Sequence, residues 1–106
     1  MTEWHRVAGC IDVAEDTPLG LTVEGVPVAL FTTNGKYFAL HDLCTHGAAR
    51  LSEGFVEGGC VECPLHQGLF DLETGAPRAA PVVEAVKTYQ VRIVDGHIEI
   101  CLQTDE

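Results

Sequence analysis

Two short segments, each pairing one cysteine with one histidine, constrain this chain more than any other feature. Cys44-Thr45-His46 reads C-x-H, and Cys63-Pro64-Leu65-His66 reads C-x-x-H. Each segment offers one thiolate and one imidazole as metal ligands. This division suits a [2Fe–2S] cluster in which two thiolates hold one iron and two imidazoles hold the other. The chain is therefore expected to bring the two segments together as loops on a common support.

A structural zinc module is the alternative for the same four residues, because two cysteines and two histidines are also a common zinc donor set. Zinc fingers, however, usually group cysteine with cysteine and histidine with histidine. The mixed pairs of this chain follow a different order. Ligand order therefore favours iron–sulfur over zinc.

The residues around the ligands resemble a known family. The segments Leu43–Gly47 and Glu62–Asp71 look like the two cluster loops of Rieske proteins. The run from Leu43 to Pro77 is similar to the soluble Rieske ferredoxins of bacterial aromatic-ring dioxygenases, especially the naphthalene and biphenyl types. The likeness extends along essentially the whole chain. It implies one Rieske-type [2Fe–2S] cluster held by Cys44, His46, Cys63 and His66.

The resemblance also implies a function as a one-electron carrier. The partners would be a flavin-containing NAD(P)H reductase, which gives the electron, and the terminal oxygenase of the dioxygenase system, which receives it. Contacts with both would be transient and the carrier a monomer. The sequence has no phosphate loop and no dinucleotide fingerprint, so the chain is not expected to be an enzyme itself. The alternative is a small Rieske-like subunit of a nitrite reductase or another oxidoreductase complex.

Composition limits the partners further. The chain has 106 residues, with sixteen acidic against six basic residues and a formal net charge of −10. Such a balance argues against nucleic acid or an anionic membrane surface and favours a basic patch on another protein. No run approaches the ~20 apolar residues of a membrane span. The N-terminal residues have no apolar signal-peptide core, so we expect a cytoplasmic protein.

Three cysteines lie outside the predicted donor set. Cys10, Cys60 and Cys101 are an odd number, which is a poor framework for disulfides and fits a reducing compartment. Cys60 and Cys63 also spell C-x-x-C, which could be a redox dithiol or half of a zinc ribbon. We favour Cys60 as a small strand residue, and Cys10 and Cys101 as buried apolar residues.

Turn signals at short spacing predict an all-β scaffold. Asn34-Gly35 and Asp95-Gly96 are strong signals for two-residue hairpin turns. The strands that they join are predicted at Val28–Thr33, Lys36–Leu40, Lys87–Val94 and His97–Leu102. In the last two, apolar residues alternate with polar ones, and the buried face is predicted to hold Tyr89, Val91, Ile93, Ile98, Ile100 and Leu102.

No window of a dozen residues holds a clean helical period, so the fold class is a small antiparallel β sandwich or barrel. Family resemblance makes this a Rieske fold: one domain over residues 1–106, with a cluster-binding subdomain at about 42–80. The segment Ala76–Pro81 would cover the cluster as a third loop, as in relatives, or would be an ordinary connection.

The reduction potential is expected in the lower part of the Rieske range. Rieske proteins of high potential carry a disulfide between the loops, and this chain has Ala49 and Leu65 at the two positions concerned. They also place hydroxyl donors just after the second loop, where this chain reads Gln67-Gly68-Leu69-Phe70. Fewer donors stabilise the added electron less, so we predict a midpoint near or below about −100 mV.

Two other groups of polar residues are open to a functional interpretation. His41 and Asp42 with His46 could form a two-histidine, one-carboxylate iron site. That site would compete with the cluster for His46, so an ordinary polar role is favoured for His41. Five carboxylates near the loops form either a docking surface or a solvated face: Glu53, Glu57, Glu62, Asp71 and Glu73.

Overall fold

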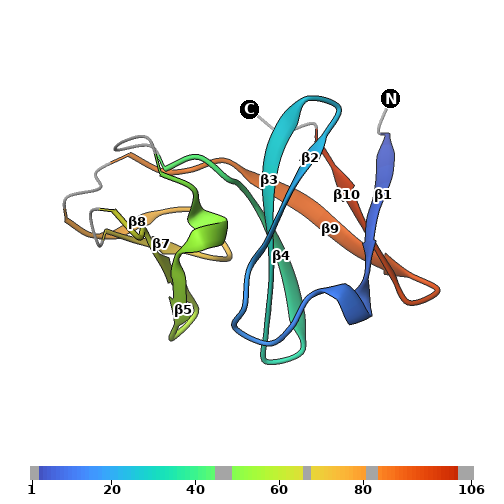
Figure 1. Ribbon diagram of the computed structural model, residues 1–106, viewed down its shortest axis with the longest axis horizontal. Helices are drawn as coiled ribbons and strands as arrows, with labels where there is room; N and C mark the ends of the chain where they lie inside the picture. The colour runs from blue at the N-terminus through green and yellow to red at the C-terminus, as the bar shows by residue number, and fades with distance from the viewer. Residues whose placement is uncertain (1–2, 45–48, 66–67, 81–83, 103–106) are drawn as a thin grey trace.

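The computed structural model describes residues 3–44, 49–65, 68–80 and 84–102, and within them the fold is all-β, as predicted. The larger of two sheets has six antiparallel strands in the order β1-β10-β9-β4-β3-β2 (Figure 1). In that order the strands are Trp4–Gly9, His97–Cys101, Thr88–Val94, Lys36–His41, Val26–Thr33 and Leu19–Val23.

The smaller sheet has four antiparallel strands and is inserted in the chain between β4 and β9. Figure 1 shows it beside the large sheet, reached by the connections that leave β4 and return to β9. Its strands, in spatial order, are β5 (Phe55–Glu57), β6 (Cys60–Glu62), β7 (Leu69–Asp71) and β8 (Pro77–Ala79). Two short 3₁₀ helices complete the described elements: η1 (Cys10–Asp12) and η2 (Leu51–Glu53).

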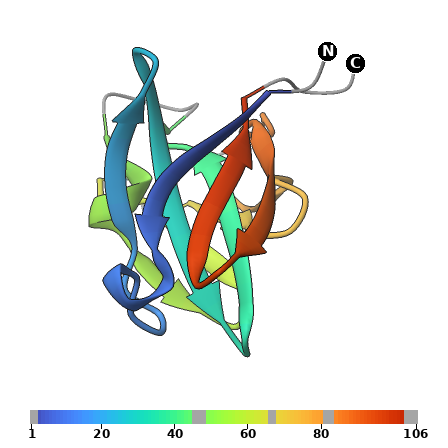
Figure 2. The same cartoon turned by 90° about the vertical axis from the view of Figure 1, so that its right-hand side faces the viewer.

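The six-stranded sheet is curled into an almost closed barrel (Figure 2). Its two edge strands, β1 and β2, both line one surface groove, formed by residues 4–7 of β1 and residues 21–24 at the β2 end. The edges thus approach each other without pairing, which confirms the expected small β barrel. No helix among the described residues has the length and apolar character that a membrane crossing requires.

Four two-residue turns set the hairpins of both sheets. Asn34 and Gly35 have φ angles of 55° and 77°, and Asp95 and Gly96 have 51° and 74°. Positive φ at both central residues is the signature of the type I′ turn, whose twist matches that of paired strands. The two predicted hairpins are therefore confirmed, with strand limits shifted by one or two residues. Glu24-Gly25 and Gly58-Gly59 form turns with the same φ signs.

The core is divided in two because the central strands bury both faces. On β3, Val28 and Leu30 belong to the cluster inside the barrel, and Ala29 and Phe31 belong to the cluster that packs against the small sheet. The period of two along a strand produces this division. The second cluster is completed by residues of the small sheet and its loops: Cys44, Ala49, Leu51, Val61, Cys63, Phe70, Leu72 and Val86, with Leu40 of β4.

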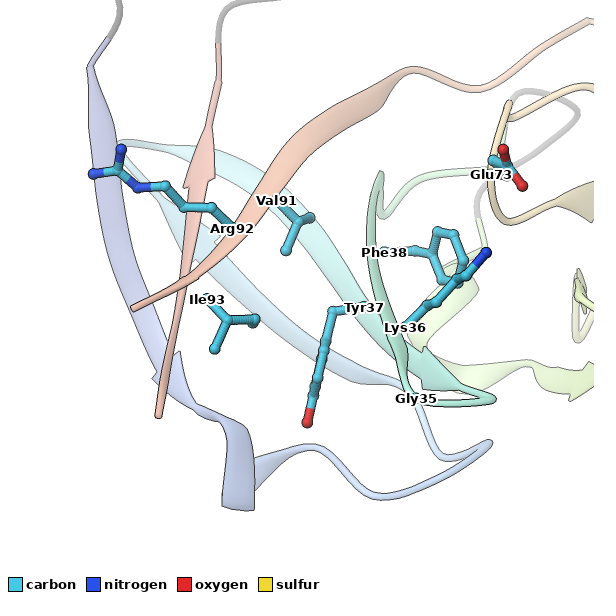
Figure 3. Close-up of a pocket in the computed structure, with 8 residues that line it drawn as sticks. All are labelled: Gly35, Lys36, Tyr37, Phe38, Glu73, Val91, Arg92 and Ile93. Carbon is cyan, nitrogen blue, oxygen red and sulfur yellow. The ribbon is translucent and has the colours of Figure 1, made fainter. Parts of the chain in front are cut away.

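The predicted buried face of β9 and β10 is confirmed at Tyr89, Ile98 and Ile100 and is wrong at Ile93, which is 45% exposed. Strand β9 pairs with β4 only through Tyr89 and Thr88, so the rest of β9 diverges from its neighbour. Ile93, Val91 and Tyr37 consequently line an open pocket between these two strands (Figure 3).

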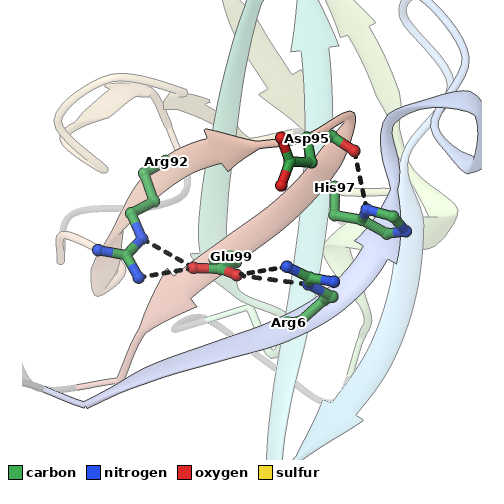
Figure 4. Close-up of polar contacts among 5 residues, drawn as sticks. All are labelled: Arg6, Arg92, Asp95, His97 and Glu99. Atoms are coloured by element: carbon green, nitrogen blue, oxygen red, sulfur yellow. Dashed lines mark hydrogen bonds and ion pairs between the residues drawn. The ribbon is translucent and has the colours of Figure 1, made fainter.

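One buried acid also departs from the alternating pattern. Glu99 of β10 lies between Arg6 of β1 and Arg92 of β9 in a cross-strand row, and each oxygen of its carboxylate accepts bonds from one guanidinium (Figure 4). The shortest of these contacts, from Arg92 Nη2, is 2.7 Å. The two arginines, Arg92 first, lower the pKa of Glu99. Arg92 also stacks on Trp4, 4.3 Å from the ring centre.

Candidate metal centre

The two predicted cysteine ligands occupy equivalent positions at the necks of two loops. The Cys44 amide donates to the Ala49 carbonyl at 2.9 Å, and the Cys63 amide donates to the Gly68 carbonyl at 2.8 Å. In both cases the acceptor lies five residues after the cysteine, so the two loops are closed in the same way. His46 and His66 fall within these loops and lie outside the described residues.

The two cysteines share one buried environment. Cys44 is 6% exposed and Cys63 is fully buried, and both belong to the apolar cluster between the sheets. Both thiol groups are thus shielded from water. A buried thiolate pair is costly unless it is neutralised by metal. Two buried thiols, each followed by a histidine in a similarly closed loop, fit the donor set of a [2Fe–2S] cluster with mixed ligands.

Histidines 46 and 66 are needed to complete that set. Within the described ranges, no three residues of the types His, Cys, Asp and Glu are gathered closely enough to hold a metal ion. Cys44 and Cys63 are the described half of the predicted set, and the assignment of all four ligands stays a prediction.

The first loop rises from the end of β4 and returns into η2. Leu43 and Arg50 form a bridge across its base, and the Leu51 amide donates to the Asp42 carbonyl at 2.7 Å. The Asp42 carboxylate is engaged by Ser52 and Arg50, and His41 Nδ1 lies 3.1 Å from the Tyr89 hydroxyl. Both side chains have protein partners, which agrees with the ordinary polar role favoured for His41.

The pKa of His41 is lowered, first by burial and then by the nearby charge of Lys87, while Asp42 opposes the shift. A neutral imidazole is thereby favoured at the end of β4. Tyr89, its hydrogen-bond partner, has a pKa raised by burial. The pair therefore links the end of β4 to β9 without a formal charge.

The second loop caps the hairpin of β6 and β7, in which Glu62 pairs with Leu69. Gly54 packs closely against this hairpin, because a Cβ at residue 54 would lie 2.0 Å from the Glu62 carbonyl oxygen. Pro64 and Leu65 face solvent, and Leu65 is 60% exposed. The loop thus combines a tightly packed base with an exposed apolar tip.

The third predicted loop begins as a strand. Residues Pro77–Ala79 form β8, which pairs with β7, so this part of the segment is more than a connection. Pro81 lies outside the described residues, and the covering role of the segment stays a prediction. Arg78 of β8 donates to the Asp71 carboxylate at 2.7 Å, which fixes β8 against the end of β7.

Two backbone hydrogen bonds at Gly75 hold the chain that leads from this segment to β9. The Val86 amide donates to the Gly75 carbonyl at 2.9 Å, and the Gly75 amide donates to the Asp71 carbonyl at 2.8 Å. Gly75 has φ of 76°, and a Cβ there would lie 2.1 Å from the Val86 carbonyl oxygen. Only glycine fits this crossing of two chain segments. In the sequence, Thr74-Gly75 indicates a turn after Leu72, but it does not reveal the crossing with Val86.

Two of the three remaining cysteines, Cys60 and Cys101, lie where the sequence predicts them. Cys60 lies on β6, and the alternation of the strand puts it with Glu62 on the face opposite Val61 and Cys63. The C-x-x-C pattern is therefore not a closed dithiol. Burial raises the pKa of the Cys60 thiol, and the nearby Asp71 raises it further. All five cysteines are described, and no disulfide joins any two of them.

Cys101 is buried, as predicted, whereas Cys10 is half-buried at the edge of the barrel core. The thiol of Cys10 shares a hydrogen bond with the Tyr37 hydroxyl, and this bond is the main cause of the raised pKa of Tyr37.

The positions linked to a high reduction potential carry no thiol and no hydroxyl. Ala49 is buried at the neck of the first loop, and Leu65 points to solvent. After the second loop, Gly68 and Phe70 are buried and Leu69 is half-buried. The described surroundings of Cys63 therefore contain none of the side-chain donors expected of high-potential relatives, and a low midpoint remains the prediction.

Comparisons with known proteins agree with this geometry. The model of the Rieske [2Fe–2S] domain family matches residues 3–90. The chain is 52% identical to the anthranilate 1,2-dioxygenase ferredoxin subunit of Burkholderia cepacia, over 94% of this chain and 93% of that one. It is 48% identical to the ferredoxin component of a naphthalene 1,2-dioxygenase system from Pseudomonas aeruginosa, over 96% and 99%.

A solved complex of reduced oxygenase and oxidized ferredoxin in carbazole 1,9a-dioxygenase contains a chain of the same fold. The TM-score is 0.91 at 30% identity, and the match covers 97% of this chain and 96% of that one. The family model matches most of the chain, and the ferredoxin relatives are covered almost completely. This chain therefore belongs to the Rieske [2Fe–2S] domain family.

Proposed function

We propose that this chain is the ferredoxin component of a bacterial aromatic-ring dioxygenase system, a carrier of single electrons and not itself an enzyme. The observation that carries the proposal is the pair of buried cysteines, Cys44 and Cys63, at equivalent necks of two loops. The named relatives that are about half identical over nearly their whole length support the same role.

We assign Cys44 and Cys63 to one iron of a Rieske-type [2Fe–2S] cluster, and His46 and His66 to the other. When bound, such a cluster supplies a reversible one-electron couple. The buried cluster of residues around the cysteines keeps water from the sulfur side. The cluster-binding subdomain would then comprise residues 42–80, which include the whole small sheet.

The exposed side chains beside the two loop necks suit a docking tip. Leu43 is 41% exposed, directly before Cys44, and Leu65 is 60% exposed, two residues after Cys63. Pro64, directly before Leu65 in the second loop, is also exposed. A small apolar tip favours a limited interface and fast release, as a carrier that alternates between two partners requires.

The acidic residues near the loops divide into two groups. Glu53, Glu57 and Glu73 are exposed, whereas Glu62 is half-buried and Asp71 is engaged by Arg78. We propose that the three exposed carboxylates, in a chain of net charge −10, steer the approach of basic partner surfaces. The rate of reduction by the reductase should then fall markedly as ionic strength rises. A rate that does not depend on salt concentration would indicate that these carboxylates form a solvated face and take no part in docking.

The proposed partners are a flavin-containing NAD(P)H reductase and a terminal oxygenase, in the cytoplasm, with the carrier as a monomer. A lasting complex would instead fit the alternative of an oxidoreductase subunit. Gel filtration of the purified chain, alone and with cell extract, separates a free carrier from a permanent subunit.

Reconstitution tests the proposal as a whole. The loaded chain is mixed with purified reductase and terminal oxygenase of an anthranilate or naphthalene dioxygenase system, with NADH and substrate. Product should form only when all three proteins are present, at a rate that rises with carrier concentration. If the reductase reduces the chain but no tested oxygenase oxidises it, the dioxygenase role is wrong while the carrier role stands. If neither transfer occurs in any pairing, the carrier role is contradicted as well.

A further inference from the structure

A buried carboxylate lies at the root of the first ligand loop. Asp42 is 1% exposed, and its side chain accepts three hydrogen bonds. The Ser52 amide donates at 2.7 Å, the Ser52 hydroxyl at 2.9 Å, and Arg50 Nη1 at 3.3 Å. All three partners donate, which is the environment of an ionised carboxylate, since that form only accepts.

The main chain of Asp42 holds this group in place. Its amide donates to the Pro27 carbonyl on β3 at 3.0 Å, and its carbonyl accepts from the Leu51 amide of η2 at 2.7 Å. Gly20 of β2 closes the site from another side: a Cβ there would lie 2.5 Å from Ser52 Oγ and 3.1 Å from Asp42 Oδ2. The carboxylate is thus fixed between the barrel and the loop that begins two residues later at Cys44.

The charges of the ion pair are unequally exposed to water. The Asp42 side chain is 1% exposed and that of Arg50 is 53% exposed. Solvent screens a surface charge far more than a buried one, so the negative charge of Asp42 acts on its buried neighbours more strongly than the positive charge of Arg50. Asp42 lies two residues before Cys44, so the less screened charge of the pair is the one at the start of the first ligand loop.

We propose that Asp42 is a positioning and tuning residue for electron transfer: it anchors the first ligand loop and, by its fixed negative charge, lowers the reduction potential of the centre. Arg50 opposes this effect from the solvent side. The inference rests on the proposed function, because it takes Cys44 to be a ligand of the [2Fe–2S] cluster. A negative charge nearby disfavours the added electron, which gives the direction of the shift.

Charge substitutions with opposite expected signs test the proposal. Midpoint potentials of the loaded wild type, Asp42→Asn and Arg50→Gln are measured by redox titration at neutral pH. Asp42→Asn should raise the midpoint, because it removes the buried negative charge and leaves Arg50 uncompensated. Arg50→Gln should lower it, because Asp42 loses its counter-ion. Glu53→Gln is the matched control: it removes one carboxylate that lines the same surface hollow but is exposed, and should shift the midpoint much less.

Ser52→Ala separates tuning from anchoring. It keeps the charge of Asp42 and removes one of its donors, so it should lower the unfolding temperature without raising the midpoint. A purely structural role predicts that Asp42→Asn and Ser52→Ala change the midpoint alike. Should Asp42→Asn fail to load, Arg50→Gln decides alone: a midpoint that stays or rises overturns the proposal. A wild type without a Rieske spectrum would instead contradict the proposed function.

Discussion

Replacing Gly75 by alanine should lower the free energy of unfolding, because the new Cβ would meet the backbone of Val86. The residue has φ of 76°, and its Cβ would lie 2.1 Å from a backbone carbonyl oxygen. A left-handed conformation costs a non-glycine residue about 1–2 kcal/mol. Forcing a methyl group into a packed site costs about 1–3 kcal/mol more. Gly75→Ala should therefore cost about 2–5 kcal/mol in total.

Gly96→Ala is the matched control for the backbone contribution alone. Gly96 has φ of 74°, and nothing lies within 4 Å of the position that a Cβ would take there. The two variants share the backbone strain and differ in the contact, so Gly75→Ala should cost about 1–3 kcal/mol more than Gly96→Ala.

Urea unfolding of the loaded protein, followed by far-UV circular dichroism, measures this difference through the shift in midpoint. Visible absorbance in the same samples reports loss of the cluster, which should occur at lower urea in Gly75→Ala than in Gly96→Ala. Equal destabilisation by the two substitutions would refute the reasoning, because the contact with Val86 would then contribute nothing.

Two further predictions concern the centre and the small sheet. His66→Cys should retain some cluster and lower its midpoint potential, because a charged thiolate replaces a neutral imidazole; a higher midpoint in redox titration would contradict the assigned tuning. Asp71→Asn should destabilise the protein at pH 7, because the Arg78 hydrogen bond lowers the pKa of Asp71 in the folded state. That stabilisation is present above the pKa of the unfolded state, about 3.9, and is lost as pH falls through the lower folded-state value. Unfolding midpoints of wild type and variant should therefore converge below about pH 4, and a gap that widens on acidification would argue against the ion pair.

The two hairpins could be predicted from the sequence because each turn type is set by two adjacent residues. Asn34-Gly35 and Asp95-Gly96 carry the φ preferences of type I′ turns in two adjacent residues. The burial of Ile93 was predicted wrongly because alternation along one strand does not reveal where its neighbour ends. Strand β9 pairs with β4 only at Thr88 and Tyr89, and no local pattern in the sequence marks that limit.

The sequence predicts the four ligands of the candidate site, an assignment that stays a prediction, but it does not reveal the residues that support the loops. Cysteine and histidine at a fixed short spacing indicate a set of metal ligands directly. Asp42 and Ser52 are ten residues apart, and Gly20 comes from another strand, so no local pattern pairs them. Thr74-Gly75 indicates a turn in the sequence, but the strict requirement for glycine arises from Val86, which contacts Gly75 from beyond a strand and a turn.

The central claim is that two sulfur and two nitrogen ligands hold one cluster in this chain. Electron paramagnetic resonance of the reduced protein, combined with electron spin-echo measurements after ¹⁵N-histidine labelling, tests that claim most directly. The account predicts a spectrum with average g below the free-electron value and couplings from two histidine nitrogens. A spectrum without histidine coupling, or a colourless protein with one zinc and no iron, would contradict it.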